Sequence, residues 1–183
     1  MKKVIVILSV LFISVSARAQ ENSLTLSGGY VFTNIEESDI DASGFRINAL
    51  FDFNPQQGMF SHGFSMGFIH TTASNTTNAQ TTDYRMINLP AYYAPRLSFG
   101  KQSFKVYIKG ALGVHFSNYK RTASHTEITD WDAGFFGGAG LGVKKIFNEK
   151  LFITLEYEWD YLSNTAYVDG FVNSAMVGVG VIF

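Results

Sequence analysis

Apolar and polar side chains alternate over most of residues 20–183. The clearest case is residues 151–162, where every odd position is apolar or aromatic and the even positions include Glu156, Glu158 and Asp160. Successive side chains of a β-strand point to opposite faces. This period of two therefore predicts a strand with one apolar face and one charged face.

The same alternation occurs in eight segments of roughly ten residues, a length typical of strands that cross a membrane. The first, third and fourth segments alternate less regularly than the others. Pro90, in the fourth, lacks the N–H that a ladder needs, so we expect a bulge or a gap there. The eight predicted strands are residues 24–33, 45–53, 60–71, 83–93, 104–116, 131–143, 151–162 and 171–183.

The connections between the predicted strands alternate between short turns and longer polar loops. Short turns are expected at residues 54–58, 98–102 and 148–150, and loops at residues 35–42, 72–82, 117–130 and 163–170. Outer-membrane barrels combine an even number of antiparallel strands with short periplasmic turns and longer surface loops. The pattern therefore predicts an all-β fold, an eight-stranded antiparallel up-and-down transmembrane β-barrel, with both ends of the mature chain on the periplasmic side.

A soluble eight-stranded barrel of the lipocalin type would alternate in the same way with its apolar face turned inward, and alternation alone does not choose between the two. The composition favours the membrane, because charged residues make up 16% of the chain, against about 25% in a typical soluble domain. A closed barrel also pairs every backbone group internally, as hydrocarbon requires. We expect aromatic girdles at the two interfaces, represented by Tyr30, Trp131, Trp159, Tyr161 and Phe183.

The first 19 residues have the parts of a secretory signal peptide: two lysines, an apolar stretch and the small-x-small site Ala17-Arg18-Ala19. We expect cleavage after Ala19, export, and a single barrel domain over residues 20–183 in the outer membrane of a Gram-negative bacterium. The absence of cysteine excludes a disulfide scaffold. The net charge of −1, more negative after cleavage, does not suggest nucleic-acid binding.

Eight strands enclose a lumen that side chains can just fill, and charges that point into it are costly unless they are paired. We therefore predict a sealed interior of paired charges without a wide aqueous pore. The residues expected in this lumen network are Arg46, Asp52, Lys105, Lys109, Asp132, Lys144, Glu156, Glu158 and Asp160.

Candidate chemistry is sparse. His115-Phe116-Ser117-Asn118 resembles the His-x-Ser-Asn stretch of outer-membrane lipid A deacylases, and a spacing of two puts a histidine base and a serine nucleophile on one strand face. The alternation turns this face toward the lumen, whereas acyl chains lie outside. We therefore expect no enzyme, with His115 and Ser117 as weak catalytic candidates. Four histidines and no cysteine suggest no metal site, and no cofactor is expected.

Four stretches resemble a known family. They are the signal ending Ala17-Arg18-Ala19-Gln20, Ile87-Asn88-Leu89-Pro90 before Ala91-Tyr92-Tyr93, Leu141-Gly142-Val143, and the closing Val179-Gly180-Val181-Ile182-Phe183. With them, the mature chain resembles the small outer-membrane β-barrel proteins of Gram-negative bacteria, in particular the outer membrane protein beta-barrel domain group common in Bacteroidetes. The C-terminal aromatic resembles the signal read by the barrel-assembly machinery, which implies folding by that machinery.

The family implies a fold and a compartment, whereas the architecture itself hosts several activities. We expect an integral outer-membrane protein with a side-chain-filled lumen, acting through its surface loops in envelope structure, adhesion or another interaction. The expected partners are outer-membrane lipid, lipopolysaccharide and an extracellular ligand at the loops, without nucleic acid. Two alternatives stay open. A narrow pore or channel for small hydrophobic molecules would be revealed by conductance, and a lipid A deacylase-like hydrolase by a change in the mass of lipid A.

Overall fold

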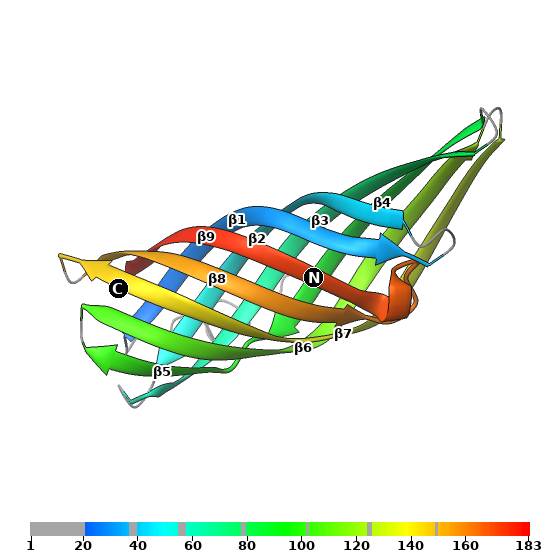
Figure 1. Ribbon diagram of the computed structural model, residues 1–183. Coiled ribbons are helices and arrows are strands. Elements are labelled where there is room, and N and C mark those ends of the chain that lie inside the picture. Colours follow the sequence, from blue (N-terminus) through cyan, green and yellow to red (C-terminus); the bar gives the residue numbers. More distant parts are fainter. Residues whose placement is uncertain are drawn as a thin grey trace, which may run out of the picture.

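The computed structural model describes residues 21–36, 40–54, 58–77, 80–101, 103–123, 126–148 and 150–183, so the predicted signal peptide lies outside the described residues. In these ranges, nine strands wrap into a closed ring (Figure 1). The strands are β1 (Glu21–Ile35), β2 (Ile40–Asn54), β3 (Phe60–Thr77), β4 (Gln80–Tyr93), β5 (Arg96–Lys101), β6 (Phe104–Ala123), β7 (Thr126–Phe147), β8 (Leu151–Leu162) and β9 (Phe171–Ile182), with a short 3-10 helix, η1 (Val168–Gly170), before β9. Within the described residues, no helix has the length and apolar content needed to cross a membrane.

The ring has eight strand positions, because β4 and β5 are two halves of one of them. Both pair with β3 on one side and β6 on the other, and they are separated only by Ala94 and Pro95. Backbone hydrogen bonds continue through the break, since the Ala94 N–H donates to the Gly63 carbonyl at 2.7 Å. All neighbours are antiparallel, and β1 closes the ring against β9. The predicted eight-stranded antiparallel barrel is confirmed.

Pro90 lies where the ladder between β3 and β4 is interrupted. The recorded pairs pass from Met66 opposite Ala91 to Ile69 opposite Asn88, with none between them. Proline has no backbone N–H and cannot donate a hydrogen bond to β3, which explains why the ladder is interrupted at Pro90. The predicted bulge or gap at Pro90 is confirmed.

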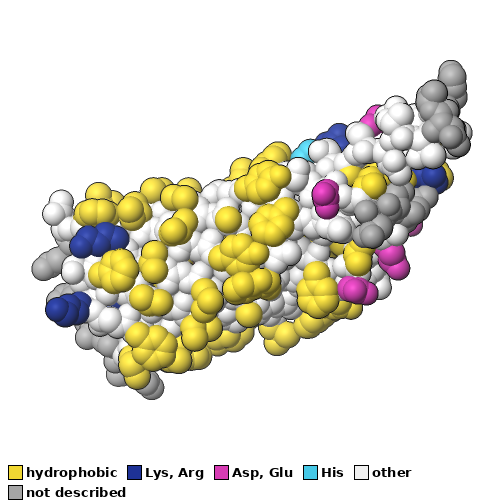
Figure 2. All heavy atoms as spheres, viewed as in Figure 1, with side chains coloured by type: hydrophobic (Ala, Val, Ile, Leu, Met, Phe, Trp, Pro, Cys, Tyr) yellow, Lys and Arg dark blue, Asp and Glu magenta, His cyan; other side chains and the backbone are white. Residues whose placement is uncertain are grey.

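The apolar faces of the strands point outward and the charged faces point inward. Leu155 on β8 is 58% exposed, while Glu158 on the same strand is fully buried. Hydrophobic side chains cover the middle of the barrel wall in Figure 2, and charged side chains gather toward its two ends. A lipocalin-type barrel would have the opposite facing, so the structure decides this alternative in favour of the membrane barrel.

Two predicted loops, residues 72–82 and 117–130, are largely strand instead. The β2–β3 ladder ends at the pair Ser43–Thr72 and the β7–β8 ladder begins at the pair Phe136–Leu162, yet β3, β4, β6 and β7 continue beyond them. They form a four-stranded extension that rises from one end of the ring (Figure 1). We call it the projecting sheet, residues 73–77, 80–84, 119–123 and 126–130.

Polar pairs across the strands hold the projecting sheet together. Ser74 Oγ donates to Asp83 Oδ1 at 2.6 Å, and Lys120 Nζ lies 2.8 Å from Glu127 Oε2. Ala73 and Tyr84 are buried at the base of this sheet, whereas its other described residues are exposed or half-buried. Cross-strand pairs and β-branched threonines stabilise a sheet whose two faces are wet beyond its base. Such a sheet needs no apolar face and therefore carries no alternation of hydrophobicity. This is why the pattern predicted loops here.

The lumen has an apolar part at the end where the sheet projects. The connection 163–170 folds back over this end, where the Glu36 N–H donates to the Ala166 carbonyl at 2.9 Å. Tyr167, which is 1% exposed, inserts among the inward side chains below it. The members of this apolar cluster include Val31, Ile35, Ile69, Tyr84, Met86, Tyr92, Phe136, Leu162, Tyr167 and Val172.

Candidate functional site

Five charged side chains meet inside the barrel, and they form what we call the lumen ion cluster. Glu156, Glu158 and Asp160 lie on the inward face of β8, Arg46 comes from β2 and Lys109 from β6. Arg46 Nη2 lies 2.9 Å from Glu158 Oε2, and Lys109 Nζ lies 2.6 Å from Glu156 Oε1. Arg46 also pairs with Asp160, and Lys109 also pairs with Glu158. Glu158 thus bridges the two cations.

Neutral polar groups complete the shell of Arg46. Its Nε donates to Asn48 Oδ1 at 3.1 Å, its Nη1 to Ser174 Oγ at 3.2 Å, and its Nη2 to the Tyr92 hydroxyl at 3.2 Å. The guanidinium is fully buried, and removing a charge from water costs several kcal/mol unless such partners compensate. Because these neutral partners come from β2, β4 and β9 and the carboxylates from β8, the cluster ties together several sides of the lumen.

A second buried ion pair lies nearer the turn end of the barrel. Arg96 Nη1 donates to Asp52 Oδ2 at 3.1 Å, and the guanidinium carbon lies 4.3 Å from the centre of the Tyr107 ring. Sequence reasoning placed Asp52 in the lumen but missed Arg96, because the predicted fourth strand ended at residue 93. The signal that could have found it is the period of two that continues from Tyr92 through Ala94 to Arg96.

Besides Asp52, three residues of the predicted lumen network lie outside the lumen ion cluster. Lys105 and Lys144 are half-buried and line a small cavity at the turn end together with Asp52 and Arg96. Lys144 Nζ lies 3.7 Å from the centre of the Phe152 ring. The prediction was wrong for Asp132, which is exposed and accepts a hydrogen bond from the Ala133 N–H at 2.7 Å. The reason is that β7 runs past the end of β8 at this point, so its inward face no longer faces a lumen.

Tyr167 closes the apolar end of the lumen. Its hydroxyl accepts a hydrogen bond from Asn88 Nδ2 at 2.8 Å and lies 2.9 Å from Thr71 Oγ1. Burial raises the pKa of Tyr167 to about 12, so the hydroxyl stays neutral at physiological pH. Sequence reasoning missed this residue, because a tyrosine in a polar connection gives no sign that the connection folds inward.

His115 and Ser117 both lie inside the barrel wall, as their strand position predicted. His115 is fully buried and its Nε2 is 2.8 Å from the Ser163 carbonyl oxygen, while Ser117 is 6% exposed. The contact with Ser163 fixes the end of the loop that follows β8. These contacts are those of a structural histidine and do not favour the hydrolase alternative.

A cavity of about 250 Å³ lies at the loop end of the lumen, where Met86, Ser117 and Asp132 line it. The cavities beside the buried ion pairs are smaller. The one bordered by Asp52, Arg96 and Lys105 measures about 40 Å³, and one between Arg96 and Glu156 measures about 10 Å³. Cavities of this size hold one or a few waters. In the part of the chain that the structure describes, no group of three or more His, Asp or Glu side chains is arranged to hold a metal ion.

The predicted girdle residues point outward. Tyr30, Trp159 and Tyr161 are 56%, 46% and 39% exposed, and Phe183 is 64% exposed. Trp131 is also exposed, at 69%, but it pairs with Asn118 on the part of β7 that has passed the end of β8. Trp131 therefore stands beside the projecting sheet, whereas the other four lie on the barrel wall.

The projecting sheet has two open edges. On β3, residues 73–77 lie beyond the last pair with β2, and on β7, residues 126–132 lie beyond the pairs with β8. Among the described residues, no strand pairs with either segment on its outer side. Ile128 and Trp131 are 48% and 69% exposed on the β7 segment. An open edge offers backbone N–H and C=O groups to another chain.

Comparison with known proteins agrees with this architecture. The crystal structure of Neisserial surface protein A (NspA) is similar with a TM-score of 0.65 and 12% identity, over 91% of this chain and 100% of that chain. Ail, the attachment invasion locus protein of Yersinia pestis, has a TM-score of 0.56 and 18% identity over 89% and 99%. A major outer membrane protein from Thermus thermophilus has a TM-score of 0.64 and 10% identity over 91% and 100%. At these identities the likeness concerns the fold.

No curated protein sequence matches the chain. The family described as outer membrane protein beta-barrel domain matches residues 5–183. Together with the outward apolar wall, this match locates the protein in the outer membrane of Gram-negative bacteria. The chain belongs to the outer membrane protein beta-barrel domain family.

Proposed function

We propose that the protein is a closed outer-membrane barrel that presents the projecting sheet to the exterior as a binding surface, and that it acts in adhesion or envelope interaction. The signal peptide over residues 1–19 and the barrel-assembly machinery would deliver it there. The observation that carries the proposal is the contrast between a filled lumen and a sheet with free edges at one rim.

The filled lumen supports a role without transport. Arg46 and Glu158 are fully buried in the lumen ion cluster, and Tyr167 covers the other part of the lumen. Cavities of about 40 and 10 Å³ beside the ion pairs leave little room for solutes. A barrel whose interior is closed by paired charges is suited to presenting a binding surface and not to transporting solutes.

The projecting sheet supports binding of another polypeptide. Peptides are often recognised by addition of a strand to an open sheet edge, where main-chain hydrogen bonds give affinity and alternate side chains give specificity. The β7 segment, residues 126–132, offers this geometry with Ile128 and Trp131 exposed. Asp130 and Asp132 on this segment favour a partner strand that carries basic residues.

The names of two similar structures point the same way. One is called a surface protein and the other an attachment invasion locus protein. Those descriptions belong to the two proteins themselves, and they support the proposal only as precedents on the same fold.

The test compares cells that display the full chain with cells that display a variant in which residues 74–83 and 119–130 are replaced by short turns. We expect the shortened variant to lose binding to immobilised extracellular-matrix proteins while it keeps the gel mobility of a folded barrel. A matched control replaces the exposed Lys150 at the opposite rim with serine and leaves binding unchanged. Equal binding by the shortened variant, or no binding by the full chain, would contradict the proposal.

A further inference from the structure

The outer wall of the barrel carries a groove whose origin is visible in the strand register. One row of outward side chains, which crosses the neighbouring strands β1, β2, β3, β4 and β6, consists of bulky residues only. In the next outward row, Ala49 of β2 pairs with Met66 of β3, and Met66 pairs with Ala91 of β4. Two positions of this second row are therefore alanine. The bulky row consists of Leu24, Phe51, Phe64, Tyr93 and Leu112.

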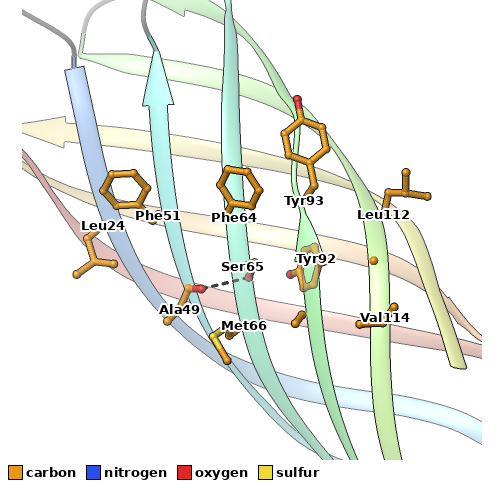
Figure 3. Close-up of a pocket in the computed structure, with 12 residues that line it drawn as sticks. Leu24, Ala49, Phe51, Phe64, Ser65, Met66, Tyr92, Tyr93, Leu112 and Val114 are labelled. Atoms are coloured by element: carbon orange, nitrogen blue, oxygen red, sulfur yellow. Dashed lines mark hydrogen bonds between the residues drawn. The ribbon is translucent and has the colours of Figure 1, made fainter. Parts of the chain in front are cut away.

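The two alanines leave a hollow beneath the bulky row. The groove has a volume of about 560 Å³ and is lined by Ala49 and Ala91. Phe51, Phe64 and Tyr93 lie along one side of it (Figure 3). Met66, which pairs with both alanines, and Val114, which pairs with Ala91, also line the groove and are 71% and 52% exposed. The lining is almost entirely apolar, and it faces the hydrocarbon that surrounds the wall of this family of barrels.

A polar pair marks one end of the groove. His62 Nδ1 lies 2.6 Å from the Tyr93 hydroxyl, and Tyr93 itself lines the groove. Phe53 and Phe60 flank His62, with ring centres 5.2 and 4.9 Å away. An imidazole and a phenol among aromatic rings, near the end of a membrane strand, fit the interfacial region where lipid headgroups lie.

We propose that this groove holds one acyl chain of a glycerophospholipid, whose phosphate-bearing headgroup contacts His62 and Tyr93. Apolar groups lose little by exchanging one hydrocarbon neighbour for another, so selective retention comes from the fit of a chain into the hollow and from the polar contact. The site is independent of the projecting sheet and of the binding role proposed above.

The position of the groove selects a phospholipid over lipopolysaccharide. Phe51 is close to the turn end of β2 and Phe64 is close to the turn end of β3. In outer-membrane barrels the short turns face the periplasm, so this end meets the periplasmic leaflet. The headgroup chemistry, a phosphate beside two hydrogen-bonding rings, is shared with lipid A, and the experiment must therefore separate the two.

The experiment refolds the full mature chain with an equal mixture of one phospholipid and lipid A, removes free lipid with detergent, and counts retained lipids by native mass spectrometry. The wild type should retain one phospholipid. Filling the hollow by Ala49→Leu with Ala91→Leu should lower this retention about tenfold. The control Ala139→Leu, which adds one leucine side chain on the outward face of β7, should not lower it. Gel mobility before and after heating checks that each variant has folded.

A second comparison isolates the headgroup contact. His62→Ala should lower retention of the phospholipid several-fold but leave retention of diacylglycerol, which lacks the phosphate, unchanged. Retention that is unaffected by Ala49→Leu with Ala91→Leu, or lowered equally by Ala139→Leu, would overturn the acyl-chain site. Equal retention of lipid A would overturn the choice of phospholipid, and an unchanged His62→Ala variant would overturn the headgroup contact.

Discussion

Replacing Arg46 with methionine removes the cation that neutralises Asp160 and shares Glu158 with Lys109. The new side chain is unbranched and shorter by the guanidinium group, so it enters the same space without a clash and the main effect is the loss of the charge. Asp160 is left fully buried without a cation, and the Tyr92 hydroxyl loses the Arg46 contact at 3.2 Å. The fold then contains an unpaired carboxylate where solvent does not reach.

The expected cost follows from what a broken buried pair costs in other proteins. Removing one partner destabilises by about 3–5 kcal/mol, because the remaining charge is buried without compensation. With a denaturant dependence of about 2 kcal/mol per molar urea, a loss of about 4 kcal/mol lowers the unfolding midpoint by about 2 M. Neutralising the orphaned groups by Glu158→Gln and Asp160→Asn in the same chain should recover most of this loss.

The assay is urea unfolding of the barrel refolded in lipid vesicles, followed by tryptophan fluorescence and by gel mobility. Lys120→Met is the control, because Lys120 pairs with Glu127 on the exposed projecting sheet, at 36% and 55% side-chain exposure. An exposed pair contributes about 0.2–1 kcal/mol. If Arg46→Met shifted the midpoint no more than Lys120→Met, the lumen ion cluster would not hold the barrel together as argued.

Two further predictions concern close packing and the loop-side plug. Gly29→Ala should destabilise by about 1–3 kcal/mol in the same assay, because the new Cβ would clash with the Ala175 carbonyl oxygen; Gly28→Ala, whose Cβ meets nothing closer than 3.7 Å, should be tolerated. Burial raises the pKa of Tyr167 above that of an unfolded tyrosine, so its contribution to stability is complete below about pH 10 and is lost as pH rises toward about 12. Tyrosinate absorbance is titrated in the wild type and in Tyr167→Phe. The variant should lack one ionisation near pH 12 that the wild type shows. If the ionisation missing from the variant lay near pH 10 instead, Tyr167 would not be buried.

The barrel wall was predictable from the sequence because the bilayer enforces a simple rule. Where one face meets hydrocarbon and the other a filled lumen, the period of two is visible, as in β8 with Glu156, Glu158 and Asp160 opposite Leu155 and its apolar neighbours. The same pattern identified the inward direction of Arg46 and Lys109. Their partners were not predictable, because alternation fixes the face of a side chain but not its height in the lumen.

The projecting sheet and the plug escaped prediction for a different reason. Beyond the membrane both faces of β6 and β7 are wet, so residues such as Thr122 and Glu127 pair without leaving a hydrophobic period. Tyr167 lies in an irregular connection and is buried only because that connection folds over the rim. Arg96 was missed because the predicted strand ended at residue 93, whereas the alternation of inward side chains continues through Ala94 to Arg96.

Closure of the lumen is tested by the current through the refolded protein in a planar bilayer. A closed lumen predicts no stable conductance for the wild type. It also predicts that small steps appear when Arg46, Lys109 and Tyr167 are all replaced by alanine, because the lumen ion cluster and the plug are then both removed. Reproducible conductance steps from the wild type would contradict the claim and would favour the narrow pore.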